Sequence, residues 1–90
     1  MRNEKRPPAD ALPPLPPGAA PGVYRHYKGN LYEVIATVRH SETLEALTLY
    51  RALYGERGLW VRPAAMFLED VEVCGVFQPR FMRLGDAETP

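Results

Sequence analysis

Hydrophobic and polar residues alternate through the middle of the chain in short runs separated by turn residues. Runs at 23–27 and 31–38 flank residues 28–30, where a glycine and an asparagine tolerate a positive φ and predict a hairpin loop. A period of two in the second run predicts that alternate residues share one strand face. These residues are Tyr32, Val34, Ala36 and Val38.

Residues 45–54 allow two interpretations. Early acidic residues, the late Arg51 and the following Gly55 are typical of a helix and its ends. Leu47, Leu49 and Leu53 instead share one face of a strand. Periodicity alone does not decide between helix and strand here.

Residues 59–62 predict a short strand that Pro63 ends. Proline suits the first position of a helix, so a helical turn is expected over residues 64–67. Val71 and Val73 alternate with a polar residue and predict a last strand, with Gly75 as a candidate bulge.

The two ends differ in composition from this middle region. Residues 1–21 hold seven of the ten prolines. Proline fixes φ and removes a backbone donor, so this segment predicts a disordered or polyproline-II tail. We therefore expect a Pro-rich tail at 1–21, one small β domain at 22–83 and a frayed C-terminus at 84–90.

Charge and cysteine content limit the ligands and the cellular location that we expect. Eleven basic and eleven acidic residues cancel, which argues against nonspecific phosphate binding by the whole chain. The single cysteine, Cys74, excludes an internal disulfide, fits a reducing cytoplasm and lies in an apolar run that predicts its burial. No apolar run reaches the ~20 residues that span a membrane, so we expect a soluble cytoplasmic protein without a membrane partner.

Five motifs follow one another in this region. They are HYKGxxY at 26–32, HSET at 40–43, YRxLYG at 50–55, WVRPxxMF at 60–67 and PRF at 79–81. Their order resembles domain-of-unknown-function family 1653, a bacterial family of short proteins. The resemblance implies a mainly β fold, a small SH3-like β-barrel or roll with one helical turn after Pro63, and it favours a strand at 45–54. It implies no activity, cofactor or catalytic residue.

Two polar groupings could carry chemistry. The loop 40–43 combines a base, a hydroxyl and a carboxylate, but it lacks the strand–turn–helix setting of an activated serine. A turn or a ligand-contacting loop is the expected role. His26, His40 and Glu42, with Glu45, offer metal-ligand types. No helical spacing brings them together, so we expect no metal, no cofactor and no catalytic residue.

Aromatic and basic residues interleave along the predicted strands. Trp60 and Arg62 share a strand face, where an indole could stack on a base and a guanidinium could hold phosphate. The alternatives are that the tyrosines and Trp60 pack in the core, and that Arg62 only braces Glu42. The candidate ligand-binding residues are His26, Lys28, His40, Ser41, Glu42, Thr43, Tyr50, Arg51, Trp60 and Arg62.

These features favour a binding module over an enzyme. The expected ligand is a nucleotide, a modified base or single-stranded nucleic acid, in a patch that combines the loop 40–43 with Arg62. A barrel that binds a proline-rich or extended peptide is the alternative. A small hydrolase or metal enzyme is the third. The oligomeric state is not predicted.

Overall fold

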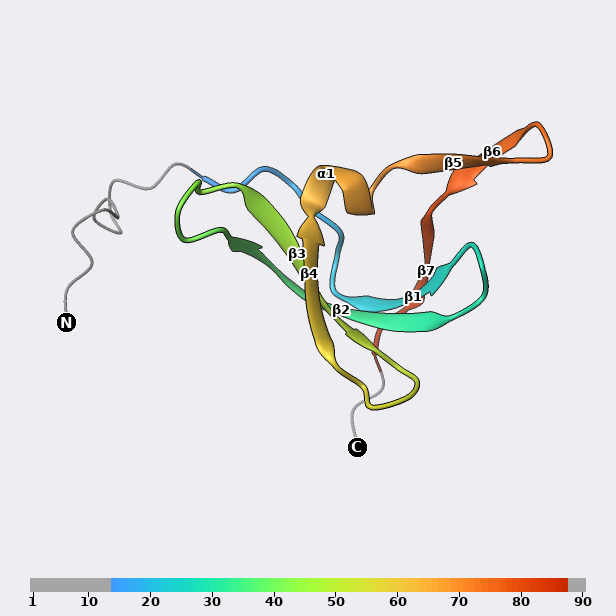
Figure 1. Ribbon diagram of the computed structural model, residues 1–90, viewed down its shortest axis with the longest axis horizontal. Coiled ribbons are helices and arrows are strands. Elements are labelled where there is room, and N and C mark those ends of the chain that lie inside the picture. The colour runs from blue at the N-terminus through green and yellow to red at the C-terminus, as the bar shows by residue number, and fades with distance from the viewer. Residues whose placement is uncertain (1–13, 88–90) are drawn as a thin grey trace.

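Five antiparallel strands form one sheet in the order β4-β3-β2-β1-β7, within residues 14–87 that the computed structural model describes (Figure 1). The strands of this sheet are β1 (Gly22–His26), β2 (Leu31–Arg39), β3 (Ala46–Ala52), β4 (Leu59–Pro63) and β7 (Phe81–Gly85). A short helix, α1 (Ala64–Phe67), follows β4, and β5 (Asp70–Val73) and β6 (Val76–Pro79) form a separate hairpin. The predicted mainly β fold class is confirmed.

Most of the local predictions hold. β1 and β2 form the predicted hairpin, residues 46–52 are a strand, and α1 begins directly after Pro63. The prediction of one last strand was incomplete, because β6 and β7 follow β5. Cys74 and Gly75 have φ values of 51° and 79°. Two successive positive φ values are typical of a tight hairpin turn, so Gly75 forms a turn and no bulge. The exposed Cys74 corrects the prediction of burial.

The sheet is open, and an SH3-like barrel is not confirmed, because β4 and β7 lie at opposite edges without pairing. The sheet nevertheless curls strongly. The ring centres of Tyr50 on β3 and Phe81 on β7 are 6.1 Å apart, although two strands lie between them. The curl makes one side concave and brings side chains from both edges together.

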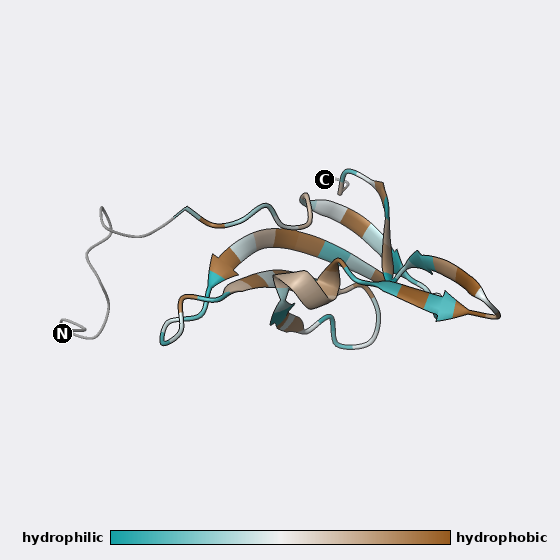
Figure 2. Ribbon diagram, turned by 90° about the horizontal axis from the view of Figure 1, so that it is seen from above, coloured by the Kyte–Doolittle hydropathy of each residue, from teal (hydrophilic) through white to brown (hydrophobic). Residues whose placement is uncertain are grey.

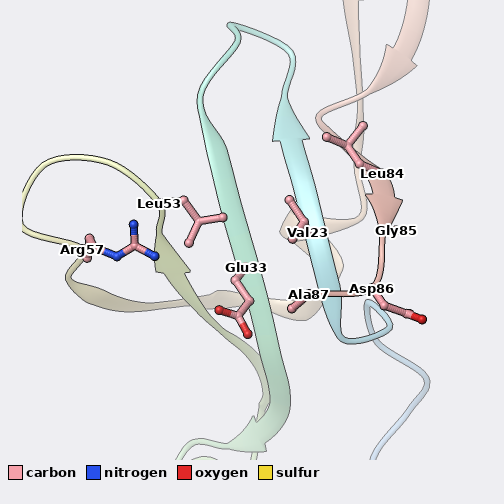
Figure 3. A pocket seen from close by; sticks show the side chains of 8 residues that line it. All are labelled: Val23, Glu33, Leu53, Arg57, Leu84, Gly85, Asp86 and Ala87. Atoms are coloured by element: carbon pink, nitrogen blue, oxygen red, sulfur yellow. The ribbon is translucent and has the colours of Figure 1, made fainter. Parts of the chain in front are cut away.

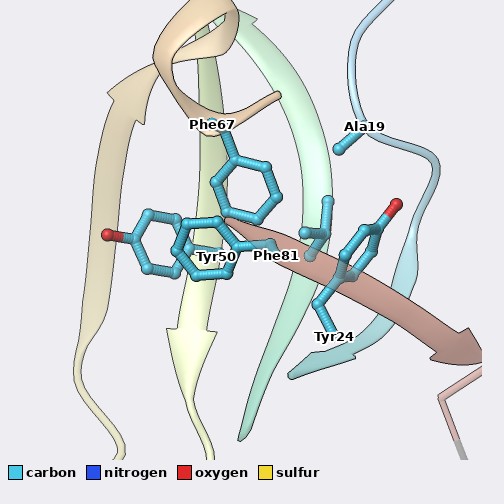
Figure 4. Close-up of a cluster of buried hydrophobic side chains, with 6 residues drawn as sticks. Ala19, Tyr24, Tyr50, Phe67 and Phe81 are labelled. Carbon is cyan, nitrogen blue, oxygen red and sulfur yellow. The ribbon is translucent and has the colours of Figure 1, made fainter. Parts of the chain in front are cut away.

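The core lies on the concave side, which we call the core face; the opposite side is the outer face. Tyr24 on β1 and Tyr50 on β3 point into it, and α1 covers them with Phe67 (Figure 4). Val34 on β2 is buried in the same cluster. The buried cluster consists of Ala19, Tyr24, Val34, Tyr50, Phe67 and Phe81. The Phe67 and Phe81 rings stack with centres 4.0 Å apart.

A bulge in β2 corrects the predicted strand face. Val34 pairs with Tyr50 and Ala36 with Leu49, so the register shifts by one residue between them. Such a shift moves the following side chains to the other face of a sheet. Tyr32 and Val34 therefore lie on the core face, whereas Ala36 and Val38 lie on the outer face.

The end of the proline-rich segment packs on the domain. Ala19 is 6% exposed and belongs to the core cluster. The Tyr24 hydroxyl donates a hydrogen bond to the Ala20 carbonyl at 2.7 Å, and the Arg83 Nη2 donates one to the Pro21 carbonyl at 2.8 Å. Residues 14–21 form no strand, in line with their proline content. The boundary at residue 22 between a tail and a folded domain stays a prediction. Residues 1–13 of the predicted tail lie outside the part of the chain that the structure describes.

The β5–β6 hairpin projects from the sheet with apolar residues in solvent (Figures 1 and 2). Val76 and Phe77 are 64% and 70% exposed. Two strands alone are marginally stable, so this hairpin depends on its connection to β7 and α1. In the described residues, 14–87, the structure has no helix long and apolar enough to span a membrane.

Thr48 on β3 gives a first testable prediction. Its side chain is fully buried, and its Oγ1 has no hydrogen-bond partner within the described residues. An unsatisfied buried hydroxyl costs about 1–3 kcal/mol, and valine fills the same volume. We expect Thr48→Val to raise the free energy of unfolding by about 1 kcal/mol in urea denaturation.

Thr43→Val is the matched control, because the Thr43 Oγ1 accepts a hydrogen bond from the Glu45 N–H at 3.1 Å. That variant should lower the free energy of unfolding by about 0.5–1.5 kcal/mol. A loss of stability in Thr48→Val would mean that the hydroxyl is satisfied in solution.

Candidate functional site

Four of the ten candidate residues lie on the core face. They are His26 on β1, Tyr50 on β3, and Trp60 and Arg62 on β4. The pairing explains this placement, since Trp60 lies opposite Tyr50 and Arg62 lies opposite Thr48. Directly opposed residues in an antiparallel pair share one face.

The structure separates the other candidates from this group. Arg51 lies opposite Leu59 and faces outward. Lys28 is exposed in the turn after β1, with its Nζ 5.8 Å from the Tyr27 ring centre. His40, Ser41, Glu42 and Thr43 form the loop between β2 and β3.

Arg62 and Trp60 differ sharply in their surroundings. The Arg62 guanidinium lies 5.7 Å from the ring centre of Phe81, so it reaches across the curled sheet from β4 to β7. Trp60 is 60% exposed, which removes it from the core. Arg62 thus has its direction fixed by an aromatic face, while the indole two residues earlier is open to solvent.

His26 lies at the centre of an aromatic group. Its ring centre is 4.9 Å from that of Phe81 and 4.6 Å from that of Tyr27. Its Nδ1 accepts a hydrogen bond from the Lys28 backbone N–H at 3.2 Å. Partial burial lowers the pKa of His26, and the positive charges of Arg62, Arg80 and Lys28 lower it further. The imidazole is therefore neutral at pH 7 and sits among three cations.

Arg80 adds to this positive region. Its Nη2 lies 3.5 Å from the Glu69 Oε1, while its Nε is buried and has no hydrogen-bond partner among the described residues. Sequence reasoning did not select Arg80 as a site residue. Arg80 lies directly before β7, a strand that the sequence did not predict. Without β7, no sequence pattern indicated that Arg80 lies near His26.

Two further tyrosines border the same face. The hydroxyls of Tyr32 and Tyr54 are hydrogen-bonded at 2.7 Å. Burial, with the hydrogen bond to Tyr54, raises the pKa of Tyr32 to about 12. Tyr32 is therefore protonated at neutral pH. Tyr54 is 47% exposed, so this side of the group reaches solvent.

The loop 40–43 is held by its own hydrogen bonds. The His40 Nδ1 accepts from the backbone N–H groups of Glu42 and Thr43 at 3.0 and 3.3 Å. The His40 N–H donates to the Glu45 carbonyl at 2.8 Å. Neither a hydrogen bond nor an ion pair connects this loop to Arg62 within residues 14–87. Within these residues, no such contact joins the loop and Arg62 into the predicted shared patch. The alternative, an ion pair between Arg62 and Glu42, is not formed there either.

The candidate metal ligands also remain apart. In the part of the chain that the structure describes, no three His, Cys, Asp or Glu side chains gather as metal ligands. His26 and His40 each use Nδ1 to accept a local backbone hydrogen bond.

A hollow on the outer face contains none of the ten candidate residues (Figure 3). It is lined by Val23, Glu33, Leu53, Arg57, Leu84, Gly85, Asp86 and Ala87. A second hollow lies between the proline-rich segment and α1, lined by Pro16, Pro17, Ala64, Ala65 and Leu68 with Glu45 and Ala46. Neither of these two hollows contains His26, Tyr50, Trp60 or Arg62, the candidate residues on the core face.

Comparisons with known proteins give a family without an activity. No curated protein matches the chain. The chain is similar to a protein from Bordetella bronchiseptica whose crystal structure is described as belonging to DUF1653, with 38% identity and a TM-score of 0.71. The match covers 80% of this chain and 94% of that one. Residues 22–83 match the family model described as a protein of unknown function, and the chain therefore belongs to the DUF1653 family.

Proposed function

We propose that the core face beside β4 and β7 binds a nucleotide, a modified base or a short single-stranded nucleic acid, and that the protein is a binding module. The observation that carries this proposal is the Arg62 guanidinium. It is fixed 5.7 Å from the Phe81 ring centre and has no carboxylate partner within residues 14–87. A positioned arginine without a carboxylate partner is suited to a phosphate group.

Charge supports an anionic ligand at this place. Burial lowers the pKa of His26, and the positive charges of Arg62, Arg80 and Lys28 lower it further, so all three cations act on this place. Glu69 neutralises part of Arg80, because the two are 3.5 Å apart. A phosphate between these cations would offset their repulsion. The chain as a whole is neutral, so binding would be local and of few phosphates.

Trp60 supplies the aromatic part of the proposed site. It lies on the same face as Arg62, two residues away, and is 60% exposed. An exposed indole accepts any base by stacking, at about 1–3 kcal/mol per base. Phosphate held by Arg62 and a base stacked on Trp60 would together fit a nucleotide unit.

The test is fluorescence anisotropy with a labelled oligodeoxythymidylate at low salt. Trp60→Ala and Arg62→Lys should each weaken binding by about 1–3 kcal/mol, since one loses the stacking surface and the other the guanidinium fork. Both should melt like the wild type.

Leu59→Ala and Arg57→Lys are the matched controls. Leu59 lies on the outer face of β4 and is 55% exposed, and Arg57 is exposed near the outer-face hollow. The controls should keep wild-type affinity. Equal losses in controls and site variants would reject the core face, and no binding by the wild type to oligonucleotide or ATP would reject the ligand class.

A proline-rich peptide is the second candidate ligand, favoured by the hollow that Pro16 and Pro17 line with α1. Because the chain's own prolines lie beside α1 there, the surface of α1 is compatible with contact to a proline-rich peptide. A labelled LPPLPP peptide in the same assay separates the candidates. Peptide binding that Trp60→Ala and Arg62→Lys leave unchanged would favour the surface at α1.

A further inference from the structure

The edge strand β4 exposes three successive apolar residues. Leu59, Trp60 and Val61 are 55%, 60% and 53% exposed. β4 pairs only with β3 among the described strands, so its other edge is free there. A free edge with apolar side chains and no charge among them is a template for another strand.

The hydrogen-bond pattern shows which groups point outward. The Ala52 N–H donates to the Gly58 carbonyl at 3.1 Å, so this opposed pair is a hydrogen-bonded pair of the β3–β4 ladder. Bonded and non-bonded pairs alternate in an antiparallel ladder. Trp60 and Arg62 therefore direct their N–H and C=O groups to β3. Leu59 and Val61 direct theirs to the free edge.

Pro63 fits the same pattern. It lies opposite Leu47 in a non-bonded pair, so a backbone N–H at this position would point to the free edge. Proline has none, and prolines in sheets are confined to such positions. The free edge thus offers donors and acceptors at Leu59 and Val61, whereas the Pro63 carbonyl accepts the first hydrogen bond of α1.

We propose that β4 pairs antiparallel with β4 of a second copy of the chain, with Val61 on the two-fold axis. In this register each Val61 N–H donates to the Val61 carbonyl of the other copy, and each Leu59 lies opposite the other Pro63. Two hydrogen bonds form on the axis, and the ladder ends at Leu59, because Pro63 has no N–H and its carbonyl accepts the first hydrogen bond of α1. The two five-stranded sheets become one continuous sheet.

The side chains match in the same register. On the outer face Val61 meets Val61 and Leu59 meets Pro63, so apolar residues cover one another. On the core face the Trp60 of one copy lies opposite the Arg62 of the other, in a non-bonded pair whose side chains are close. Because the Arg62 guanidinium is turned towards Phe81 of its own copy, the indole meets the aliphatic part of the other Arg62 side chain. The pairing rests on the strand edge alone and does not depend on the proposed function.

The test is the mass in solution by sedimentation velocity, at about 5–500 μM protein, where micromolar association is visible. The wild type should sediment with twice the mass of one chain. Val61→Pro removes the central donor, which points away from β3, and should give a folded monomer. Val61→Lys keeps the backbone and should also give a monomer.

Leu84→Lys is the matched control. Leu84 is 49% exposed on β7, the opposite edge of the sheet, and this variant should remain a dimer. A monomeric wild type over the whole range would overturn the proposal. Dimers that persist in Val61→Lys would overturn it as well, because they would use another surface.

A cross-link tests the register itself. Cα atoms of a bonded antiparallel pair are about 5.5 Å apart, within the range of a disulfide. In a Cys74→Ser background, Val61→Cys should form a covalent dimer on air oxidation, while Leu84→Cys should not. Equal cross-linking of both, or none at Val61→Cys, would reject this register.

Discussion

Replacing Phe67 with alanine should lower the free energy of unfolding by about 3–5 kcal/mol, the usual cost of truncating a buried phenylalanine. Phe67 is 1% exposed. Its ring stacks on Phe81 at 4.0 Å and meets the Tyr24 ring edge-to-face at 5.6 Å. The variant loses contacts to β1 and β7 at once, and a cavity opens under α1.

This loss is large for so small a domain. Single domains are stable by about 5–15 kcal/mol, so a loss of about 3–5 kcal/mol removes at least about a fifth of the total. Each 1 kcal/mol corresponds to about 4–8 °C in Tm for 60–100 residues, so Tm should fall by at least about 12 °C. Calorimetry measures the change. Met66→Ala, in the same turn and 46% exposed, is the control and should stay within about 1 kcal/mol. Equal effects of both variants would mean that α1 does not close the core.

The sequence predicted correctly those elements whose structure depends on a few neighbouring residues. The β1–β2 hairpin follows from Gly29 and Asn30, and α1 follows from Pro63. β3 was ambiguous from periodicity, and the structure shows the reason. Its buried face carries Thr48 and Tyr50, whereas Leu47 and Leu49 lie on the half-buried outer face. The most hydrophobic residues of this strand therefore do not mark the core.

The candidate site was predictable only where one strand carries it. The period of two placed Trp60 and Arg62 on one face, and the pairing of β4 with β3 agrees. The partners of Arg62 come from β1 and β7, which the curl of the sheet brings near. No local pattern predicts that curl, and β7 was itself missed. Phe81 and Arg80 could therefore not be recognised beside His26.

The bulge in β2 is a second long-range effect. Strict alternation predicted one face for Tyr32 through Val38, but the register shifts after Val34. One inserted residue lets Val34 fill the core at 1% exposure while the rest of the strand follows the curl. The sequence between Val34 and Ala36 contains no glycine or proline that would have signalled it.

The second large effect should come from Ala19, in a segment that composition alone assigns to a tail. We expect Ala19→Asp to lower the free energy of unfolding by at least about 2 kcal/mol, because a buried carboxylate loses its hydration. Ala19 is 6% exposed among core residues that include Tyr24 and Val34.

Ala20→Asp provides a closely matched control, since Ala20 is exposed and offers only its carbonyl to Tyr24. It should unfold within about 0.5 kcal/mol of the wild type. Urea denaturation of both variants decides whether residues 18–21 belong to the folded unit. If Ala19→Asp and Ala20→Asp unfold alike and near the wild type, the segment is not packed in solution and the domain begins at Gly22. If only Ala19→Asp is destabilised, the folded unit extends before the family-matched region, and any truncation at residue 22 removes part of its core.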